Sequence, residues 1–343
     1  MKFAGIIAEY DPFHNGHAWQ LAQAKALGAE RVAVAMSCSL VQRGALPLLP
    51  EAVRTRSALT CGADLVFALP APCACAGAEA FARAGVALLA AAGCDGLVFG
   101  AETPDAALLM EAAELLDSGS YRAALKAQLA GGARSFAAAR QAAAAQLASD
   151  ERVAALLDKP NNNLAVEYCR AIRSLAPRME AYPLPRQGAN HGEALHSAHG
   201  QFASASALRK LWAEGGADAV APYVPEAVFP LYQEAYAAGQ YTDFDAAGRC
   251  ELALLRARCT GETPFANVRG VSEGLEHRLE KAVRASTTLD ELLNTLTTIR
   301  YPRARMRRLA MDAALGYTEE AFPALPPYLH LLGARRELLG QLK

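Results

Sequence analysis

Two histidines near the amino terminus, His14 and His17, form the pattern His-Asn-Gly-His. An apolar run at residues 3–8 precedes the pattern and a helical pattern follows it, so the histidines lie where a strand ends and a helix begins. The first turn of a helix suits phosphate, and a glycine there lets a ligand approach the backbone. Imidazoles at such a turn can donate hydrogen bonds to a leaving pyrophosphate. A turn capped by Asn15, with two surface histidines, explains the same four letters.

A second candidate anion site is the sequence SASALR at residues 204–209. It places hydroxyl groups on Ser204 and Ser206 at a helix start, with Arg209 about one turn further on. Exposed N–H groups, hydroxyls and a guanidinium together suit a triphosphate. The alternative interpretation is an ordinary serine N-cap.

The elements that would position these residues follow from the first hundred residues, where short apolar runs alternate with helical patterns. Strands that are apolar throughout, separated by helices, predict a parallel sheet covered on both faces. The predicted fold class is therefore a doubly wound α/β fold, which binds ligands at the carboxyl ends of its strands. The expected strands are residues 2–10, 31–37, 63–70 and 94–100, and the expected helices are residues 17–28, 51–62 and 78–93.

The remainder of the chain is predicted to be mostly helical. Residues 103–174 read almost wholly as helix, residues 179–186 as a late strand, and residues 204–216 as a helix that opens on a serine. The proline-punctuated sequence APYVPEAVFP then marks a soft boundary. We expect a first domain over residues 1–218, which contains both candidate anion sites, and a smaller, mainly helical domain over residues 219–343.

Composition narrows the classes of function. The 343 residues carry a formal net charge of -1, so any nucleic-acid surface must be a local patch. No window of about eighteen uncharged apolar residues is present, and we therefore expect no membrane partner. The amino terminus reaches Glu9 too soon for the core of a signal peptide, so a cytoplasmic location is the expectation.

Metal-binding patterns are weak. The eight cysteines form no Cys-x-x-Cys pair, and buried reduced thiols are the expectation. The spacing of His191, His196 and His199 fits no standard set of metal ligands, so we expect no metal held by the protein alone. Glu9 and Asp11 are candidates to hold Mg²⁺ through water beside a triphosphate.

Together, the two anion motifs resemble those of the nucleotidyltransferase superfamily, which carries His-x-Gly-His early and a Ser-[Ser/Thr]-x-x-Arg-like motif late. More specifically, GIIAEYDPFHNGH at residues 5–17 resembles the opening of the bacterial tRNA(Met) cytidine acetate ligase family. Further stretches follow in that family's order and extend the resemblance over most of residues 3–210. They are VQRG, GADLVFALP, VFGAE, PNNNLAVEYCRAI, PLPRQGA and FASASALR.

The resemblance implies a HIGH-type, Rossmann-like nucleotidyltransferase that acts as an ATP-dependent ligase. The family forms acetyl-adenylate from acetate and ATP, and then acetylates N4 of the wobble cytidine of elongator tRNA(Met). By position, the resemblance makes His14 and His17 catalytic, on the phosphates. The ATP-binding residues that it implies are Ile7, Ala8, Glu9, Tyr10, Asp11, Pro12, Phe13, His14, Asn15, Gly16, His17, Gln20, Gly100, Asn161, Asn162, Arg186, Gln187, Ser204, Ser206 and Arg209.

Five arginines in the segment TIRYPRARMRRLAMDAALGY could hold RNA phosphates, with the tyrosine available for stacking. A solvated helix face explains such a run equally well. The family resembled has a basic, tyrosine-containing segment in the same relative place, which favours tRNA. The expected tRNA-binding residues are Arg300, Arg303, Arg305, Arg307 and Arg308.

The sequence also departs from the family pattern. Asp11 stands where the family has asparagine, and the stretch RGALPLLPEAVR lacks the acidic residue, the lysine and the tryptophan expected there. Ala45, Glu51 and Ala52 occupy those positions, which would slow the enzyme or change its acceptor. The chain is also short for the family.

Two other functions stay open at this point. A small-molecule adenylyltransferase or cytidylyltransferase of the same superfamily would explain both anion motifs, with the basic segment merely structural. A non-catalytic paralogue that binds nucleotide or RNA is the second, and the departures favour it slightly. A tRNA shift assay tests the first, and ATP turnover with and without acetate tests the second. The sequence does not indicate an oligomeric state.

Overall fold

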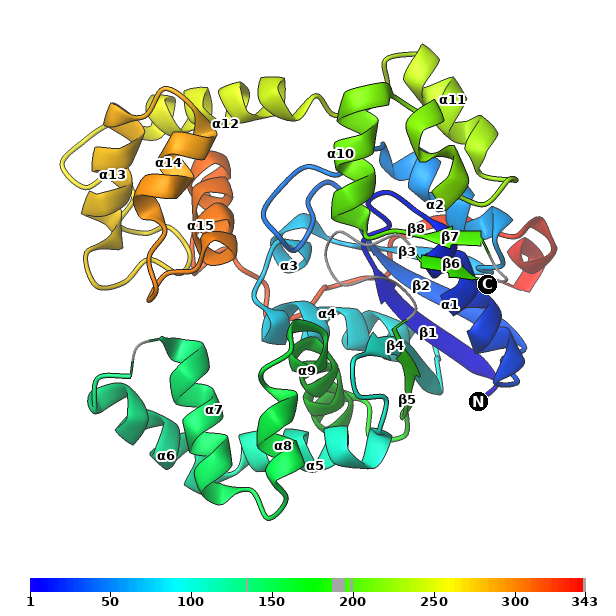
Figure 1. Cartoon of the computed structure of the whole chain (residues 1–343), viewed down its shortest axis with the longest axis horizontal. Coiled ribbons are helices and arrows are strands. Elements are labelled where there is room, and N and C mark those ends of the chain that lie inside the picture. Colours follow the sequence, from blue (N-terminus) through cyan, green and yellow to red (C-terminus); the bar gives the residue numbers. More distant parts are fainter. Residues whose placement is uncertain (134, 187–194, 198–199, 342–343) are drawn as a thin grey trace.

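A computed structural model describes residues 1–133, 135–186, 195–197 and 200–341 of the chain (Figure 1). Five strands run parallel in one six-stranded sheet, and a sixth strand joins one edge in antiparallel orientation. The doubly wound α/β fold is therefore confirmed. In spatial order the strands are β5 (Glu180–Pro185), β4 (Gly96–Ala101), β1 (Phe3–Ala8), β2 (Arg31–Ser37), β3 (Leu65–Leu69) and β8 (Leu331–Ala334).

The strand order reverses at β1, which lies between β2 and β4. Loops that leave neighbouring strands on opposite sides of such a point open a crevice at their carboxyl ends. Helices cover both faces of the sheet and bury two separate apolar layers. One face carries α1 (Asn15–Ala26), α2 (Glu51–Thr60) and α10 (Ala205–Gly215), and the other carries α4 (Ala78–Ala91), α5 (Ala106–Asp117) and α9 (Pro160–Leu175).

The connection from β4 to β5 is helical, as predicted for residues 103–174. Within it, two helices form a hairpin that extends away from the sheet (Figure 1). The hairpin helices are α6 (Gly119–Ala130) and α7 (Phe136–Leu147), and α8 (Glu151–Leu156) follows them. The short elements elsewhere in the sheet domain are α3 (Ala71–Ala74), β6 (Leu195–Ser197) and β7 (Gly200–Phe202).

The carboxyl-terminal helices have an apolar core of their own, built between residues 252 and 314 (Figure 1). Three of these helices bury positions three or four residues apart, whereas residues 309–314 of the last helix are all buried. The helices of this part are α12 (Phe244–Arg258), α13 (Leu275–Ala285), α14 (Leu289–Leu296) and α15 (Arg303–Leu315).

Two segments after residue 218 pack with the sheet instead. The turn η1 (Asp218–Tyr223) and α11 (Phe229–Ala237) bury Val220 and Tyr232 in the apolar layer beside α10, and β8 pairs with β3. These side chains therefore share the apolar layer of the sheet, and the domain boundary near residue 218 stays a prediction. The chain then ends in the turn η2 (Arg336–Gln341) on the sheet side. Among the described residues, no helix is long and apolar enough to cross a membrane.

Candidate active site

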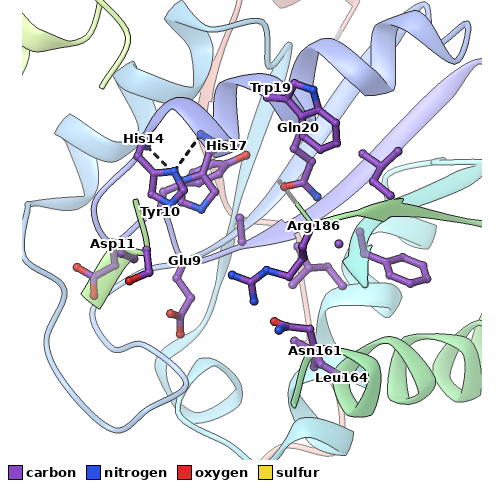
Figure 2. A pocket seen from close by; sticks show the side chains of 18 of the residues that line it. Glu9, Tyr10, Asp11, His14, His17, Trp19, Gln20, Asn161, Leu164 and Arg186 are labelled. Carbon is purple, nitrogen blue, oxygen red and sulfur yellow. Dashed lines mark hydrogen bonds between the residues drawn. The ribbon is translucent and has the colours of Figure 1, made fainter. Parts of the chain in front are cut away.

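A cavity of about 380 Å³ opens at the carboxyl ends of β1 and β4, where the strand order reverses (Figure 2). The first turns of α1 and α10 form part of its wall. The structure brings together most of the residues that the family resemblance implies for ATP. Those that line the cavity are Ile7, Ala8, Glu9, Tyr10, Asp11, His14, Gly16, His17, Gln20, Gly100, Asn161, Arg186 and Ser204.

The two histidines cap the first turn of α1. The Nδ1 atom of His14 accepts from the N–H of Gly16 at 3.0 Å, and Nδ1 of His17 accepts from the N–H of His14 at 3.2 Å. The rings stack with their centroids 3.8 Å apart (Figure 2). Gly16 permits this arrangement, because a Cβ there would lie 2.9 Å from the His14 ring. The backbone therefore fixes one nitrogen of each ring and leaves Nε2 for a ligand.

Both imidazoles are neutral near pH 7. Burial, together with the smaller effect of the cationic Arg186 and Arg209, lowers the pKa of His14 to about 3. Burial also lowers the pKa of His17 well below its usual value, with His14 and Arg186 adding to the effect. A neutral ring whose Nδ1 accepts a hydrogen bond carries its proton on Nε2. The cavity thus holds two fixed N–H donors at a helix amino terminus.

Asp11 is buried beneath this turn and binds two arginines. Its carboxylate pairs with Arg43, lies 3.3 Å from Nη1 of Arg209, and accepts from the N–H of Leu48 at 2.5 Å. Arg209 also donates to the carbonyl of Asp11 at 2.5 Å, and burial lowers its pKa to about 10. Asp11 thereby ties α10 to the end of β1. Arg209 is consequently directed at Asp11 and does not line the cavity.

Glu9 presents the other carboxylate of the cavity. Its Oε1 accepts from the N–H of Gln42 at 2.5 Å, and its side chain points away from the histidines in Figure 2. Burial raises the pKa of Glu9, although Arg43 and the bond from Gln42 oppose this rise. Arg54, fully buried, donates to the carbonyl of Glu9 at 2.8 Å and of Ser37 at 2.6 Å, and so fixes the ends of β1 and β2.

The first two of the three asparagines in the PNNNL stretch have different roles. Asn161 lines the cavity and donates through Nδ2 to Glu102 at 2.5 Å. Asn162 is fully buried, and its Oδ1 accepts from the N–H of Thr103 at 2.9 Å. Partial burial would raise the pKa of Glu102, but hydrogen bonds from Asn161 and Asn162 lower it. Asn161 and Asn162 therefore connect the start of α9 with the end of β4, and of the two only Asn161 lines the cavity.

Arg186 and Gly100 face each other across the ends of β5 and β4. A Cβ on Gly100 would lie 3.4 Å from Cγ of Arg186, so the arginine side chain passes close to the glycine. Figure 2 shows the Arg186 guanidinium directed into the cavity. Across the described ranges, no carboxylate forms an ion pair with Arg186, and its charge is available to phosphate.

The remaining residues implied for ATP do not line the cavity. Ser206 is exposed, and its Oγ lies 3.0 Å from Oγ of Ser204, which does line the cavity and caps α10 by accepting from the N–H of Ala207 at 3.2 Å. Phe13 is buried, and Asn15 donates to the carbonyl of Pro222 at 3.3 Å. Gln187 lies outside the described residues. The described residues implied for ATP that do not line the cavity are thus Pro12, Phe13, Asn15, Asn162, Ser206 and Arg209.

Sequence reasoning missed several lining residues. Gln42 belongs to the matched stretch VQRG, to which no site residue was assigned, and Phe99 and Pro185 directly adjoin the selected Gly100 and Arg186. Adjacency was therefore an available signal for those two, and also for Trp19 beside Gln20 and for Ala203 and Ala205 beside Ser204. Phe81 and Tyr168, on helices of an alanine-rich chain, gave no such signal. The other missed lining residues are Trp19, Phe81, Leu164, Tyr168, Leu184, Ala203 and Ala205.

The five arginines expected to bind tRNA divide into two groups. Arg300 pairs with Glu273 at 2.7 Å, Arg303 pairs with Asp290, and Arg305 lies over the Tyr301 ring at 5.1 Å, all toward the surface. The other two turn toward the sheet domain: Arg307 donates to the carbonyl of Gly44 and Arg308 to that of Gln42, each at 3.2 Å. The first group alone keeps the expected surface position.

Metal ligands do not cluster in the part of the chain that the structure describes. His191 and His199 lie outside the described residues, as does the side chain of His196. Of the two carboxylates considered for Mg²⁺, Asp11 is fully engaged with Arg43 and Arg209. Glu9 alone keeps an oxygen, Oε2, that faces the cavity without a hydrogen-bonding partner in the described structure.

Known proteins match this chain over its whole length. A family model described as HIGH Nucleotidyl Transferase matches residues 1–343. The tRNA(Met) cytidine acetate ligase of Acetivibrio thermocellus is 32% identical over 100% of this chain and 86% of its own length. The corresponding ligase of Syntrophotalea carbinolica is 35% identical over 97% of this chain and 80% of its own length.

Solved structures agree with this match. The apo crystal structure of Thermotoga maritima TmcAL is 29% identical, with a TM-score of 0.91 over 99% of this chain and 83% of that chain. The same protein bound with alpha-thio ATP matches with a TM-score of 0.87 over 97% of this chain and 80% of that chain. Fold, histidine turn and family match together define a HIGH nucleotidyltransferase. Within that class, the chain belongs to the tRNA(Met) cytidine acetate ligase family.

Proposed function

We propose that this chain activates acetate with ATP and transfers the acetyl group to N4 of the wobble cytidine of elongator tRNA(Met). One observation carries the proposal for the first step. His14 and His17 are stacked, neutral and fixed through Nδ1, on the first turn of α1 and inside the cavity where the strand order reverses. Family membership then supplies acetate and tRNA as the substrates.

In the first step an oxygen of acetate attacks the α-phosphate of ATP. The bond from that phosphorus to the bridging oxygen breaks, and pyrophosphate leaves with acetyl-adenylate as the other product. Negative charge grows on the leaving pyrophosphate, where fixed N–H donors stabilise it without reorganisation. His14 and His17 supply these donors, Arg186 supplies positive charge, and the first turns of α1 and α10 add backbone N–H groups.

In the second step the N4 amine of cytidine attacks the acetyl carbonyl carbon. A C–N bond forms, the bond from the acetyl carbon to the AMP oxygen breaks, and the amine releases a proton as AMP leaves. Holding the adenylate and the base side by side supplies much of the acceleration. We assign tRNA binding to the helical part of the chain, through Arg300, Arg303 and Arg305 at its surface.

Mg²⁺ is proposed to come with the nucleotide, since it keeps several waters and binds triphosphate oxygens. Glu9 is the residue that fits a water-mediated contact, because Asp11 is already neutralised by two arginines. The ion would offset negative charge on the phosphates; the protein's part is to orient a water through Glu9.

The test is mass spectrometry of nucleosides from elongator tRNA(Met) after incubation with the protein, ATP and isotopically labelled acetate. We expect one acetyl group on the wobble cytidine, dependent on both ATP and acetate. Pyrophosphate release without label in tRNA would instead favour a small-molecule nucleotidyltransferase. Absence of both pyrophosphate release and label would favour a non-catalytic paralogue.

A further inference from the structure

The loop at residues 41–48 lies between the helical domain and the cavity, and both sides bind it. The loop closes on itself, since the N–H of Val41 donates to the carbonyl of Ala45 at 2.9 Å and the N–H of Gly44 to that of Val41 at 2.9 Å. A closed turn of this kind moves as one unit. What holds it on one side therefore influences what it contacts on the other.

The helical domain binds the loop at three places. Arg307 and Arg308 on α15 donate to the carbonyls of Gly44 and Gln42, each at 3.2 Å. Thr242, next to the start of α12, donates from its N–H to the carbonyl of Leu48 at 2.8 Å. Its hydroxyl donates to the carbonyl of Pro47 at 2.6 Å. Both ends of the loop are thus attached to the same domain.

Gly44 brings the loop directly against the backbone of α15. Its φ of +78° lies in the left-handed region, and a Cβ there would lie 2.7 Å from the backbone N of Arg308 and 2.8 Å from the carbonyl carbon of Arg307. Any side chain at this position would separate the loop from the helix. Glycine at position 44 therefore permits both the left-handed turn and the close approach of the loop to α15.

The loop in turn fixes the two carboxylates at the end of β1. The N–H of Gln42 donates to Glu9 at 2.5 Å, Arg43 pairs with Asp11, and the N–H of Leu48 donates to Asp11 at 2.5 Å. Gln42 also lines the cavity. Its carbonyl accepts from Arg308 while its N–H donates to Glu9, so a single residue connects α15 with a cavity side chain.

We propose that Arg307, Arg308 and Gly44 are positioning residues for adenylate formation, acting through loop 41–48 on Glu9 and Gln42. The helical domain then has a part in the first step, before any tRNA is bound. This inference rests on the proposed function for its reaction and on the contacts above for its route. It also removes Arg307 and Arg308 from the surface that would meet tRNA.

The experiment measures acetate-dependent exchange of labelled pyrophosphate into ATP, without tRNA, for the full chain. We expect Gly44→Ala and Arg308→Ala to lower kcat roughly tenfold to a hundredfold, as displaced catalytic groups do, with little change in KM for ATP. Arg308→Lys, which keeps a cationic donor, should recover part of the loss. A purely structural role would lower thermal stability without this split between kcat and KM.

Two control variants match the two test variants. Gly93 has a φ of +88° and nothing within 4 Å of an added Cβ, so Gly93→Ala carries the same backbone strain without the collision. Arg256 donates to the carbonyl of Ser286 at 2.7 Å within the helical domain, so Arg256→Ala removes an equivalent bond away from the loop. Both controls should retain the exchange rate of the parent.

Amide hydrogen exchange of the peptide 38–48 gives a readout that does not depend on activity. We expect faster exchange of this peptide in Gly44→Ala and Arg308→Ala than in the two controls. If the parent shows no acetate-dependent pyrophosphate exchange, the proposed function fails, and the inference is judged on this peptide alone. Unchanged amide exchange there, or a kcat within twofold of an active parent in the two test variants, would overturn it.

Discussion

Two regions of this molecule offer groups to phosphate, and they are built in opposite ways. On the turn after β1, the backbone fixes Nδ1 of both His14 and His17, and the rings stack 3.8 Å apart. At the start of α15, Arg300 and Arg303 extend into solvent with 66% and 41% of their side-chain surface exposed, each paired with one carboxylate. The first region is preorganised, and the second exchanges partners easily.

The difference teaches what each region can contribute. Fixed, neutral donors stabilise charge that develops during a reaction, because they need no rearrangement. Exposed arginines attract a polyanion in a salt-dependent way and add little to a reaction barrier. Substitutions on the β1 turn should therefore change rates, whereas those of the exposed Arg300 and Arg303 should change affinity and its dependence on salt.

The largest effect is expected at His17. We predict that His17→Ala lowers acetate-dependent pyrophosphate exchange by about a hundredfold or more, because one donor to the leaving group is lost. Circular dichroism should show an intact fold. His277 on α13 provides the matched control, since it is exposed and lies outside the cavity, and His277→Ala should retain the parent's rate. Comparable rates for the two variants would show that the β1 turn does not act on the leaving group.

Substitutions of Asp11 measure how much its ion pairs with Arg43 and Arg209 stabilise the turn after β1. We predict that Asp11→Ala lowers the free energy of unfolding by roughly 3 kcal/mol, because Arg43 and Arg209 lose their buried carboxylate. Asp11→Asn keeps an acceptor oxygen for Leu48 and should cost less. Urea denaturation of both variants measures the difference. Equal stability of Asp11→Ala and the parent would mean that the two arginines contribute nothing through Asp11.

The neutral histidines make a prediction about pH. The pKa of His14 is lowered to about 3 in the folded chain, whereas an unfolded histidine titrates near 6.5, so below that pH the unfolded chain binds the extra proton. Stability should therefore fall as pH decreases from 7 toward 4, by about 1.4 kcal/mol per pH unit for each such histidine. His14→Asn should reduce this dependence in thermal unfolding at several pH values. An unchanged slope would contradict a depressed pKa at His14.

Sequence patterns predicted the parallel sheet because its strands are short apolar runs bounded by turns. They missed β8, since its four residues resemble any loop until they pair with β3, more than 260 residues earlier in the chain. The cavity was predicted where chemistry and backbone coincide in one segment, as at His14 and Gly16. Parts of the site whose interacting residues come from distant segments were not predictable, as for the ion pair of Asp11 with Arg209.

The arginine run at residues 300–308 likewise shows that sequence does not reveal contacts with distant segments. Its composition indicates a basic surface, but residues one turn apart on the same helix face, such as Arg303 and Arg307, still meet different neighbours along the helix axis. Arg303 meets Asp290 at the surface, while Arg307 and Arg308, about one turn on, reach the carbonyls of loop 41–48. Sequence alone does not say which side of α15 the sheet domain occupies, so the division into two groups required the packed structure.

The smallest effect is expected for the exposed arginines, and it concerns affinity. We predict that the double variant Arg300→Ala with Arg303→Ala binds elongator tRNA(Met) more weakly. Its slope of log affinity against log salt should fall by about two, because two phosphate contacts are lost. Arg56 and Arg152 provide a control, since each is exposed and paired with one carboxylate outside the helical domain.

Filter binding at several salt concentrations makes this comparison quantitative. Arg56→Ala with Arg152→Ala removes the same two charges and should leave the slope nearly unchanged, because those arginines lie on α2 and α8 rather than on the proposed tRNA surface. An equal reduction in both double variants would indicate that overall charge, and no particular surface, attracts the RNA. An unchanged slope in the first double variant would make Arg300 and Arg303 part of a solvated helix face, leaving tRNA recognition to other parts of the chain.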